Sequence, residues 1–210
     1  MSNFEVLKPF GPSIIKIKMP NEMIEQINMY VDSVINDEQK IKKLDEGDKL
    51  IGKVQQEFLM EVEFMKKIKW ANFLAANVSS WAKEELNKEI KHFELIKSWV
   101  VRQFKNDYNP VHWHTGDVSG VGYLKVPSYL GNTSQPDKKT NENGKLQLIF
   151  GSPNLFSKST YLVKPEIGDF YLFPNYLMHT VFPFKGTDDE RRSISFNATI
   201  DDEIYDVYGK

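Results

Sequence analysis

The chain has 210 residues, a formal net charge of −2 at pH 7 and no cysteine. Without Cys it forms no disulfides, thiolate metal sites or cysteine nucleophile, so any bound metal must use imidazole and oxygen ligands. The balanced charge argues against a nucleic-acid partner. Charged or polar residues interrupt each apolar run well short of a membrane span, so a cytoplasmic, intracellular protein with no membrane partner is expected.

Helical periodicity dominates residues 20–94. Apolar side chains recur at three- and four-residue spacing in the first part of this stretch, where Asn21 is a suitable N-cap. A charged loop is expected at residues 37–53. Two further helices are predicted over residues 54–68 and 72–95. Residues 1–94 are therefore predicted to form a helical buttress packed on the rest of the chain.

The pattern changes to short β-type runs after His92. The predicted strands are residues 95–104, 118–126, 145–150, 161–164, 169–173, 180–184 and 193–200. Many short strands separated by Gly, Pro and Asn clusters are typical of a double-sheet jelly roll. The predicted fold class is therefore α+β with a mainly β core, a cupin-like jelly roll over residues 95–210. The polar stretch 127–144 is interpreted as either a lid or a disordered insertion, because it is long for a compact domain.

Three of the four histidines lie in the second half of the chain. His112 and His114 are two residues apart, so in an extended strand both imidazoles project to one face. His179 follows several strands later and is the natural third ligand if the sheets bring the two segments together. Three ligands on one face of an octahedral ion leave three positions for substrate and oxygen. His92, at a helix end, is predicted to be structural.

Asp117 is an alternative metal ligand, because a tight turn after His114 would bring its carboxylate back toward the ion. One histidine would then orient a ligand instead of binding the metal. A Gly-Asp pair before a strand is also ordinary turn chemistry, which is the competing explanation for this residue.

Arginine is scarce in this chain, which has 24 Lys and three Arg. Arg191 and Arg192 are adjacent, and a planar, two-pronged donor suits an anion better than a lysine does. Arg191 and Ser193 share one face of the predicted strand, whereas Arg192 faces the other way and is expected to be solvated or salt-bridged. Arg192 stays open as the alternative anion clamp. Its candidate ion-pair partners are Asp188, Asp189 and Glu190.

Four motifs in order resemble those of the Fe(II)- and 2-oxoglutarate-dependent oxygenases, and within them a prolyl-hydroxylase-like group of bacteria and phages. The resemblance covers about half of the chain. Its motifs are Asn109-Pro110-Val111-His112-Trp113-His114, Ser119-Gly120-Val121-Gly122-Tyr123-Leu124, Gly168-Asp169-Phe170-Tyr171-Leu172-Phe173-Pro174 leading to His179, and Glu190-Arg191-Arg192-Ser193-Ile194-Ser195-Phe196-Asn197.

The resemblance implies a double-stranded β-helix that holds iron by a histidine and a carboxylate near the first motif and by a distal histidine. His112 matches the first ligand and His179 the distal one, whereas His114 stands where most of the superfamily has Asp. A neutral imidazole there leaves one more positive charge on the iron site. The Arg191-x-Ser193 pair is similar to the clamp for the distal carboxylate of 2-oxoglutarate.

The function implied is that of a non-haem Fe(II)- and 2-oxoglutarate-dependent dioxygenase. It is expected to use O2 to hydroxylate a small-molecule or peptide substrate, namely a peptidyl or free, proline-like amino acid. Tyr123 is expected either to donate its hydroxyl to the cosubstrate or to fill the core, and Trp113 to pack or touch substrate. Two alternatives stay open. One is a three-histidine dioxygenase that does not use 2-oxoglutarate, and the other is a non-catalytic cupin-like binding or structural protein.

Overall fold

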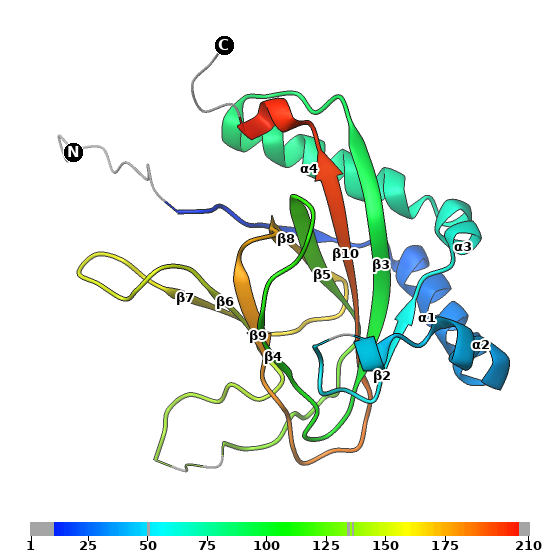
Figure 1. Ribbon diagram of the computed structural model, residues 1–210. Coiled ribbons are helices and arrows are strands. Elements are labelled where there is room, and N and C mark those ends of the chain that lie inside the picture. Colours follow the sequence, from blue (N-terminus) through cyan, green and yellow to red (C-terminus); the bar gives the residue numbers. More distant parts are fainter. Residues whose placement is uncertain (1–10, 50, 134, 136, 206–210) are drawn as a thin grey trace.

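Two antiparallel sheets form the centre of the molecule (Figure 1). The computed structural model describes residues 11–49, 51–133, 135 and 137–205. The larger sheet has the order β1 (Ile15–Lys18), β8 (Asp169–Pro174), β5 (Val118–Lys125), β10 (Arg191–Ile200), β3 (Phe93–Gln103) and β2 (Gln56–Leu59). The smaller sheet has the order β4 (Asn109–His112), β9 (Met178–Val181), β6 (Leu146–Ile149) and β7 (Thr160–Val163). This β-dominant α+β architecture confirms the predicted fold class.

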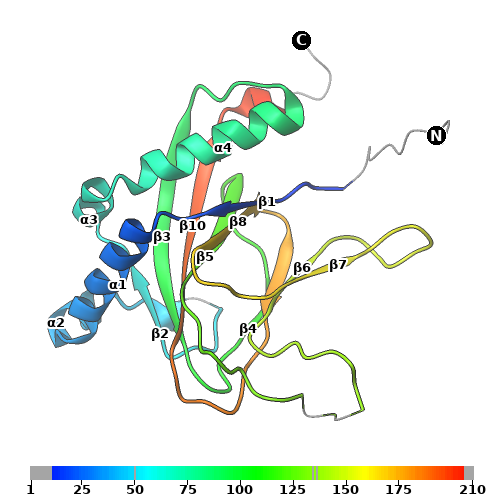
Figure 2. The ribbon, with the colours of Figure 1, turned by 180° about the vertical axis from the view of Figure 1, so that it is seen from behind.

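Helices cover the outer face of the larger sheet (Figure 2). They are α1 (Asn21–Ile35), α2 (Glu38–Leu44), α3 (Val62–Lys67) and α4 (Trp70–Leu86), with short 3₁₀ turns at Gly47–Lys49 and Asp202–Tyr205. The buried stripe of α1 and that of α4 pack in one apolar cluster with Val100, Ile194 and Phe196 of the sheet. The buried Trp70 indole N–H donates to Ser98 Oγ at 3.0 Å, which fixes α4 on β3. None of the described helices is long and apolar enough to cross a membrane.

The N-terminal part differs from the predicted helical buttress because it also contributes strands β1 and β2 to the larger sheet. Strand β2 lies inside the helix predicted over residues 54–68. Pairing with β3 decides the conformation of this short segment, because tertiary contacts override weak local propensity.

Two helix boundaries also differ from the prediction. Helix α2 forms inside the expected loop because the Asp37 side chain accepts hydrogen bonds from the N–H groups of Gln39 and Lys40. Helix α4 ends at Leu86, well before residue 95, because Asn87 adopts a left-handed conformation with φ of 54°. The chain then enters β3 at Phe93. Strand β4 is an additional element that the pattern did not predict.

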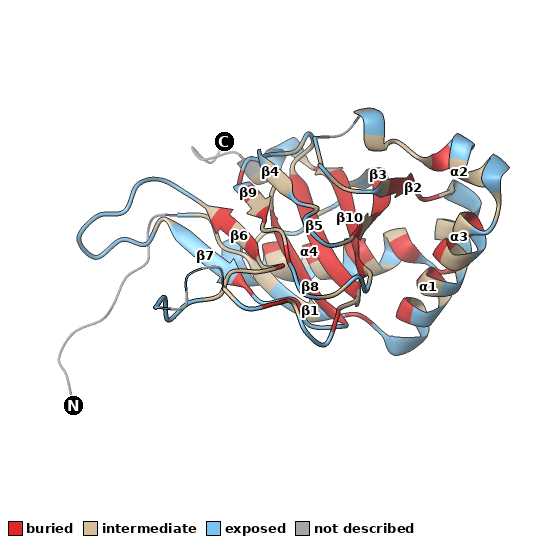
Figure 3. Cartoon of the chain, turned by 90° about the horizontal axis from the view of Figure 1, so that it is seen from below, coloured by how far each residue is buried: buried red, intermediate tan, exposed pale blue. Residues whose placement is uncertain are grey.

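Strand β10 is buried along nearly its whole length (Figure 3), and its side chains alternate between two parts of the interior. Ile194, Phe196 and Ala198 point into the apolar cluster under the helices. The alternate residues Arg191 and Ser193, with Ser195 and Asn197, face the space between the two sheets and line a cavity there. This alternation places polar groups in the interior and positions the candidate site.

The polar stretch 127–144 contains no helix or strand among its described residues. Its two ends are attached to the segment before β10. Lys185 N–H donates to the Leu130 carbonyl at 3.1 Å, and Gly144 N–H donates to the Pro183 carbonyl at 3.2 Å.

Arg192 belongs to a buried ion network that joins the larger sheet to α1. Its side chain is fully buried. Arg192 Nε and Nη2 donate to the two carboxylate oxygens of Glu190 at 2.7 and 2.9 Å, and Nη2 also donates to Asp32 at 2.7 Å. Glu190 also accepts from Arg102 Nε at 2.8 Å. Of the three partners proposed from sequence, the structure places Glu190 on Arg192. The distant Asp32 is an additional partner.

Replacing Glu190 with Gln is expected to lower the free energy of unfolding at pH 7 by about 3 kcal/mol, because it leaves the Arg102 guanidinium without its anion and the buried Arg192 guanidinium with Asp32 alone. Burial alone would raise the pKa of Glu190, but the hydrogen bonds from Arg192 and Arg102 hold it below the usual value. The stabilisation is therefore present above the unfolded-state pKa and is lost as pH falls through the lower folded-state pKa.

Urea unfolding of the wild type and of the Glu190→Gln variant, measured from pH 7 down to pH 3, checks this expectation. The difference between the two proteins should be largest near neutral pH and shrink in acid. The matched control is Glu63→Gln on α3, whose side chain is 85% exposed. A difference that does not change with pH would contradict the assigned role.

Candidate active site

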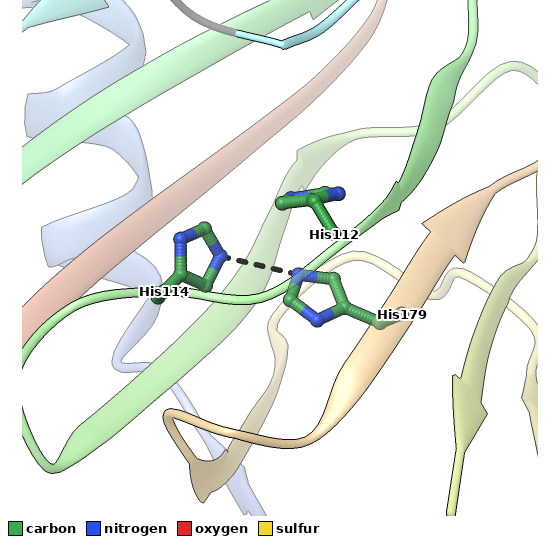
Figure 4. Close-up of side chains that lie close together, drawn as sticks. All are labelled: His112, His114 and His179. Carbon is green, nitrogen blue, oxygen red and sulfur yellow. Dashed lines mark hydrogen bonds between the residues drawn. The ribbon is translucent and has the colours of Figure 1, made fainter.

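Three histidine side chains meet between the two sheets (Figure 4). His112 ends β4 and pairs in register with His179 of β9, while His114 lies in the irregular segment that follows β4. Each offers one ligand nitrogen, and these nitrogens all lie within 4.8 Å of one another. The spacing of His112 and His114 and the return of His179 therefore bring together the three imidazoles proposed from sequence. We call them the histidine cluster.

Backbone carbonyls hold two rings of the histidine cluster in position. His112 Nδ1–H donates to the Pro110 carbonyl at 2.7 Å, and His179 Nδ1–H donates to the Leu177 carbonyl at 2.9 Å. In this tautomer the Nε2 lone pair of each ring is free for an ion. His114 Nε2 lies 3.1 Å from His179 Nε2. Two imidazole–metal bonds of about 2.1 Å at a right angle would separate their nitrogens by about 3 Å.

Burial keeps the histidine cluster neutral. It lowers the pKa of His179 to about 4, and burial together with the neighbouring rings lowers that of His114 to about 2. The pKa of His112 is lowered as well, again by burial. Unprotonated lone pairs are what a divalent transition metal requires. The donor set thus fits an ion such as Fe(II), with nitrogen ligands only.

The histidine cluster opens onto a cavity of 260 Å³ between the sheets. Apolar side chains of Leu146, Phe173 and Val181 line part of it, and the polar face of β10 lines another part. The exposed Trp113, at 67% exposure, is also on its lining. None of the described residues of 127–144 lines the cavity, so the described part of the polar stretch does not cover it.

Arg191 reaches the same cavity and has an incomplete set of partners. Its side chain is 1% exposed, and Nη1–H donates to Gln103 Oε1 at 2.9 Å. Its Nε and Nη2 atoms are buried and have no hydrogen-bond partner. These two donors form one edge of the guanidinium, the edge that bonds both oxygens of a carboxylate. Because a buried, unpartnered cationic donor is costly, the edge is suited to a bound anion.

Ser193 and Tyr123 flank this free edge in different ways. Ser193 lines the cavity two residues after Arg191 on the same face of β10. The Tyr123 ring packs in the core with its centroid 5.1 Å from Arg191 Cζ, and its buried hydroxyl has no partner. Burial raises the pKa of Tyr123 to about 12, so the hydroxyl is a donor at neutral pH. The two roles considered for Tyr123 are compatible in this geometry.

Asp117, the alternative metal ligand, lies outside the histidine cluster. Its carboxylate accepts the Ile200 N–H at 2.9 Å and caps the end of β10. Arg192, the alternative clamp, is turned into the ion network with α1. His92 is exposed, 3.8 Å from Glu94, and takes no part in the cavity.

Sequence reasoning missed two residues of the cavity lining, the buried Glu57 and the half-buried Asn109, whose Oδ1 atom is buried. Glu57 lies in a segment that was interpreted as helical. The one available signal of a buried carboxylate was its position next to the apolar run Phe58-Leu59-Met60. Asn109 opens the motif that contains His112, but no role was assigned to it.

Residues 97–197 match a family described as "Putative 2OG-Fe(II) oxygenase". No curated protein matches the chain significantly. A prolyl-4-hydroxylase from Pseudomonas putida superposes with a TM-score of 0.57 at 14% identity, covering 89% of this chain and 91% of that one.

Two further structures are similar to the same extent. HygX from Streptomyces hygroscopicus, with nickel, 2-oxoglutarate and hygromycin B bound, has a TM-score of 0.56 at 14% identity and covers 90% of this chain and 83% of its own. A prolyl hydroxylase from Trichoplax adhaerens, in complex with a hypoxia inducible factor peptide fragment, has the same TM-score and identity, with 90% and 84% covered. At this identity the likeness establishes the fold, and it confirms the predicted jelly roll.

Proposed function

We propose that the chain is an Fe(II)- and 2-oxoglutarate-dependent oxygenase, and specifically a hydroxylase that acts on a peptidyl or free amino acid. The family match over residues 97–197 supports an enzyme that uses iron and 2-oxoglutarate. The observation that carries the assignment of residues is that three neutral imidazoles and an unpartnered guanidinium edge share one cavity. Two of the similar structures are prolyl hydroxylases, so proline is the first side chain to test.

The histidine cluster would hold the iron, and the free edge of Arg191 would hold the distal carboxylate of 2-oxoglutarate. When bound, Fe(II), 2-oxoglutarate and O2 together convert a substrate C–H bond into C–OH and release succinate and CO2. Ser193 would give a third contact to the carboxylate, and the Tyr123 hydroxyl is a further donor beside it. The carbonyls of Pro110 and Leu177 orient the imidazoles, and Phe173 with Leu146 and Val181 excludes water from this part of the cavity.

Anaerobic reconstitution of the full chain tests the proposal. Fe(II) is added first and 2-oxoglutarate second, while the visible spectrum is followed for the weak charge-transfer band of the chelate. Admission of O2 should then produce succinate, and a hydroxylated product when the right substrate is present. Iron and 2-oxoglutarate are expected to bind in a ratio of one each per chain.

A second candidate is a three-histidine dioxygenase that does not use 2-oxoglutarate, favoured by the imidazole of His114 in place of a carboxylate. Stoichiometric iron without the charge-transfer band, and O2 consumption without succinate, would favour this candidate. Failure to bind stoichiometric metal would favour a non-catalytic, cupin-like binding protein instead.

A further inference from the structure

Two buried acceptor atoms in the cavity lining have no hydrogen-bond partner. They are Glu57 Oε2 and Asn109 Oδ1, and we call them the acceptor pair. Glu57 is 2% exposed and lies on β2, the edge strand of the larger sheet. Asn109 lies on β4 of the smaller sheet, the strand that also carries His112. An unpartnered buried acceptor is unfavourable and indicates that a donor is missing.

The two acceptor side chains lie close together, because both adjoin Gly52. A Cβ at residue 52 would lie 2.6 Å from Glu57 Oε1 and 3.1 Å from Asn109 Oδ1. Within the described part of the chain, no lysine or arginine forms an ion pair with Glu57. Lys97, the lysine among the described lining residues, has its Nζ over the Trp99 ring at 5.1 Å from the centroid. The acceptor pair is therefore available to a ligand.

Electrostatics agree with a missing cation at this position. Burial raises the pKa of Glu57 to about 7, helped by the nearby Asp45 and opposed by Lys97. A bound cation would keep the carboxylate ionised and so compensate the energy of burying it. The Glu57 carboxylate is thus suited to an ion-pair partner and not to an apolar substrate.

Unpartnered donors and acceptors occupy different parts of the cavity. Glu57 pairs in register with Val101, which pairs in turn with Ser193 of the Arg191 face. Glu57 therefore lies two strands, or about 10 Å, across the sheet from the proposed cosubstrate clamp. A carboxylate ligand fits the Arg191 side. The acceptor pair calls for a ligand with donors only.

We propose that Glu57 and Asn109 bind a protonated amino group of the substrate. This inference rests on the proposed function and narrows its substrate class. An ammonium group offers N–H donors and no acceptor, which complements the two oxygens. A proline inside a peptide has no N–H and cannot fill the site, whereas a free amino acid, proline included, or a lysine-type side chain can.

Calorimetric titration of the full chain tests this inference with three probes. L-proline carries a free α-ammonium, Nα-acetyl-L-lysine methylamide carries a side-chain ammonium alone, and N-acetyl-L-proline methylamide carries none. The titrations are run on metal-free protein and on protein with Ni(II) and 2-oxoglutarate. Saturable binding of either ammonium probe is expected, and which of the two binds identifies the source of the amino group.

The Glu57→Gln variant should raise the Kd of the bound ammonium probe by at least about tenfold, because it removes one member of a buried charge pair. Glu63→Gln is the matched control and should leave this Kd unchanged. Absence of binding by both ammonium probes would overturn the inference. The inference would also be overturned if N-acetyl-L-proline methylamide bound with the same Kd as the ammonium probes. A Glu57→Gln variant with the wild-type Kd and a lowered Tm would likewise overturn it, because Glu57 would then have a structural role.

Gly52→Ala provides a second variant that retains Glu57. The added Cβ displaces the Glu57 carboxylate, and its effect on the Kd of the ammonium probe should match the direction seen in Glu57→Gln. A separate titration with 2-oxoglutarate distinguishes the two proposals. If the ammonium probe binds and 2-oxoglutarate does not, the proposed function is contradicted alone. If 2-oxoglutarate binds and neither ammonium probe does, the proposal that Glu57 and Asn109 bind an amino group is contradicted alone.

Discussion

Replacement of His179 by alanine is expected to abolish stoichiometric iron binding. His179 is the member of the histidine cluster that links the two others, since its Nε2 lies 3.1 Å from that of His114 and its strand pairs with that of His112. Removing it leaves two imidazoles, with no described carboxylate close enough to replace the third. Because changes to groups that merely support a ligand cost about 10- to 100-fold in metal affinity, loss of a ligand itself should exceed 100-fold.

Iron content after anaerobic equilibration, measured by mass spectrometry of the metal, checks this expectation. His92→Ala is the matched control, because His92 is an exposed histidine outside the cavity. Asp117→Asn should also keep one iron per chain, since the Asp117 carboxylate caps Ile200. Loss of iron in Asp117→Asn would favour the ligand set that contains Asp117, and retention of iron in His179→Ala would contradict the histidine cluster.

Replacement of Arg191 by methionine is expected to weaken 2-oxoglutarate binding by at least about 30-fold, which corresponds to about 2 kcal/mol for a buried charge pair. Met fills much of the side-chain volume but has no donor for the distal carboxylate. The same change should leave the unfolding free energy equal to or above that of the wild type in the absence of 2-oxoglutarate, because it removes a buried cation with two unpartnered donors.

This combination separates a clamp from a structural arginine. Titration of 2-oxoglutarate against the charge-transfer band gives the affinity, and urea unfolding gives the stability. Arg192→Met is the matched comparison. It should lower stability through the ion network with Glu190 and Asp32, with a smaller effect on 2-oxoglutarate. Unchanged 2-oxoglutarate affinity in Arg191→Met would remove the clamp assignment.

Local patterns were sufficient for most strands of residues 93–200, β4 excepted, and for predicting which residues share one face of a strand. Alternation placed Arg191 and Ser193 on one face of β10 and Arg192 on the other, because the two-residue period of a strand is a property of the chain itself. The spacing of His112 and His114 likewise predicted that both imidazoles share a side. These relations need no knowledge of distant residues.

The amino-acid sequence by itself determined the resemblance to the oxygenase family, the β-dominant fold and the histidine and arginine candidates. Tertiary structure alone decided that residues 56–59 form a strand, that Asp117 caps β10, and that Arg192 is neutralised by Asp32 of α1. It also brought Glu57 and Asn109 together from different sheets. The physical reason is that burial, ion pairing and unsatisfied hydrogen bonds depend on partners far apart in the chain, which local periodicity does not encode.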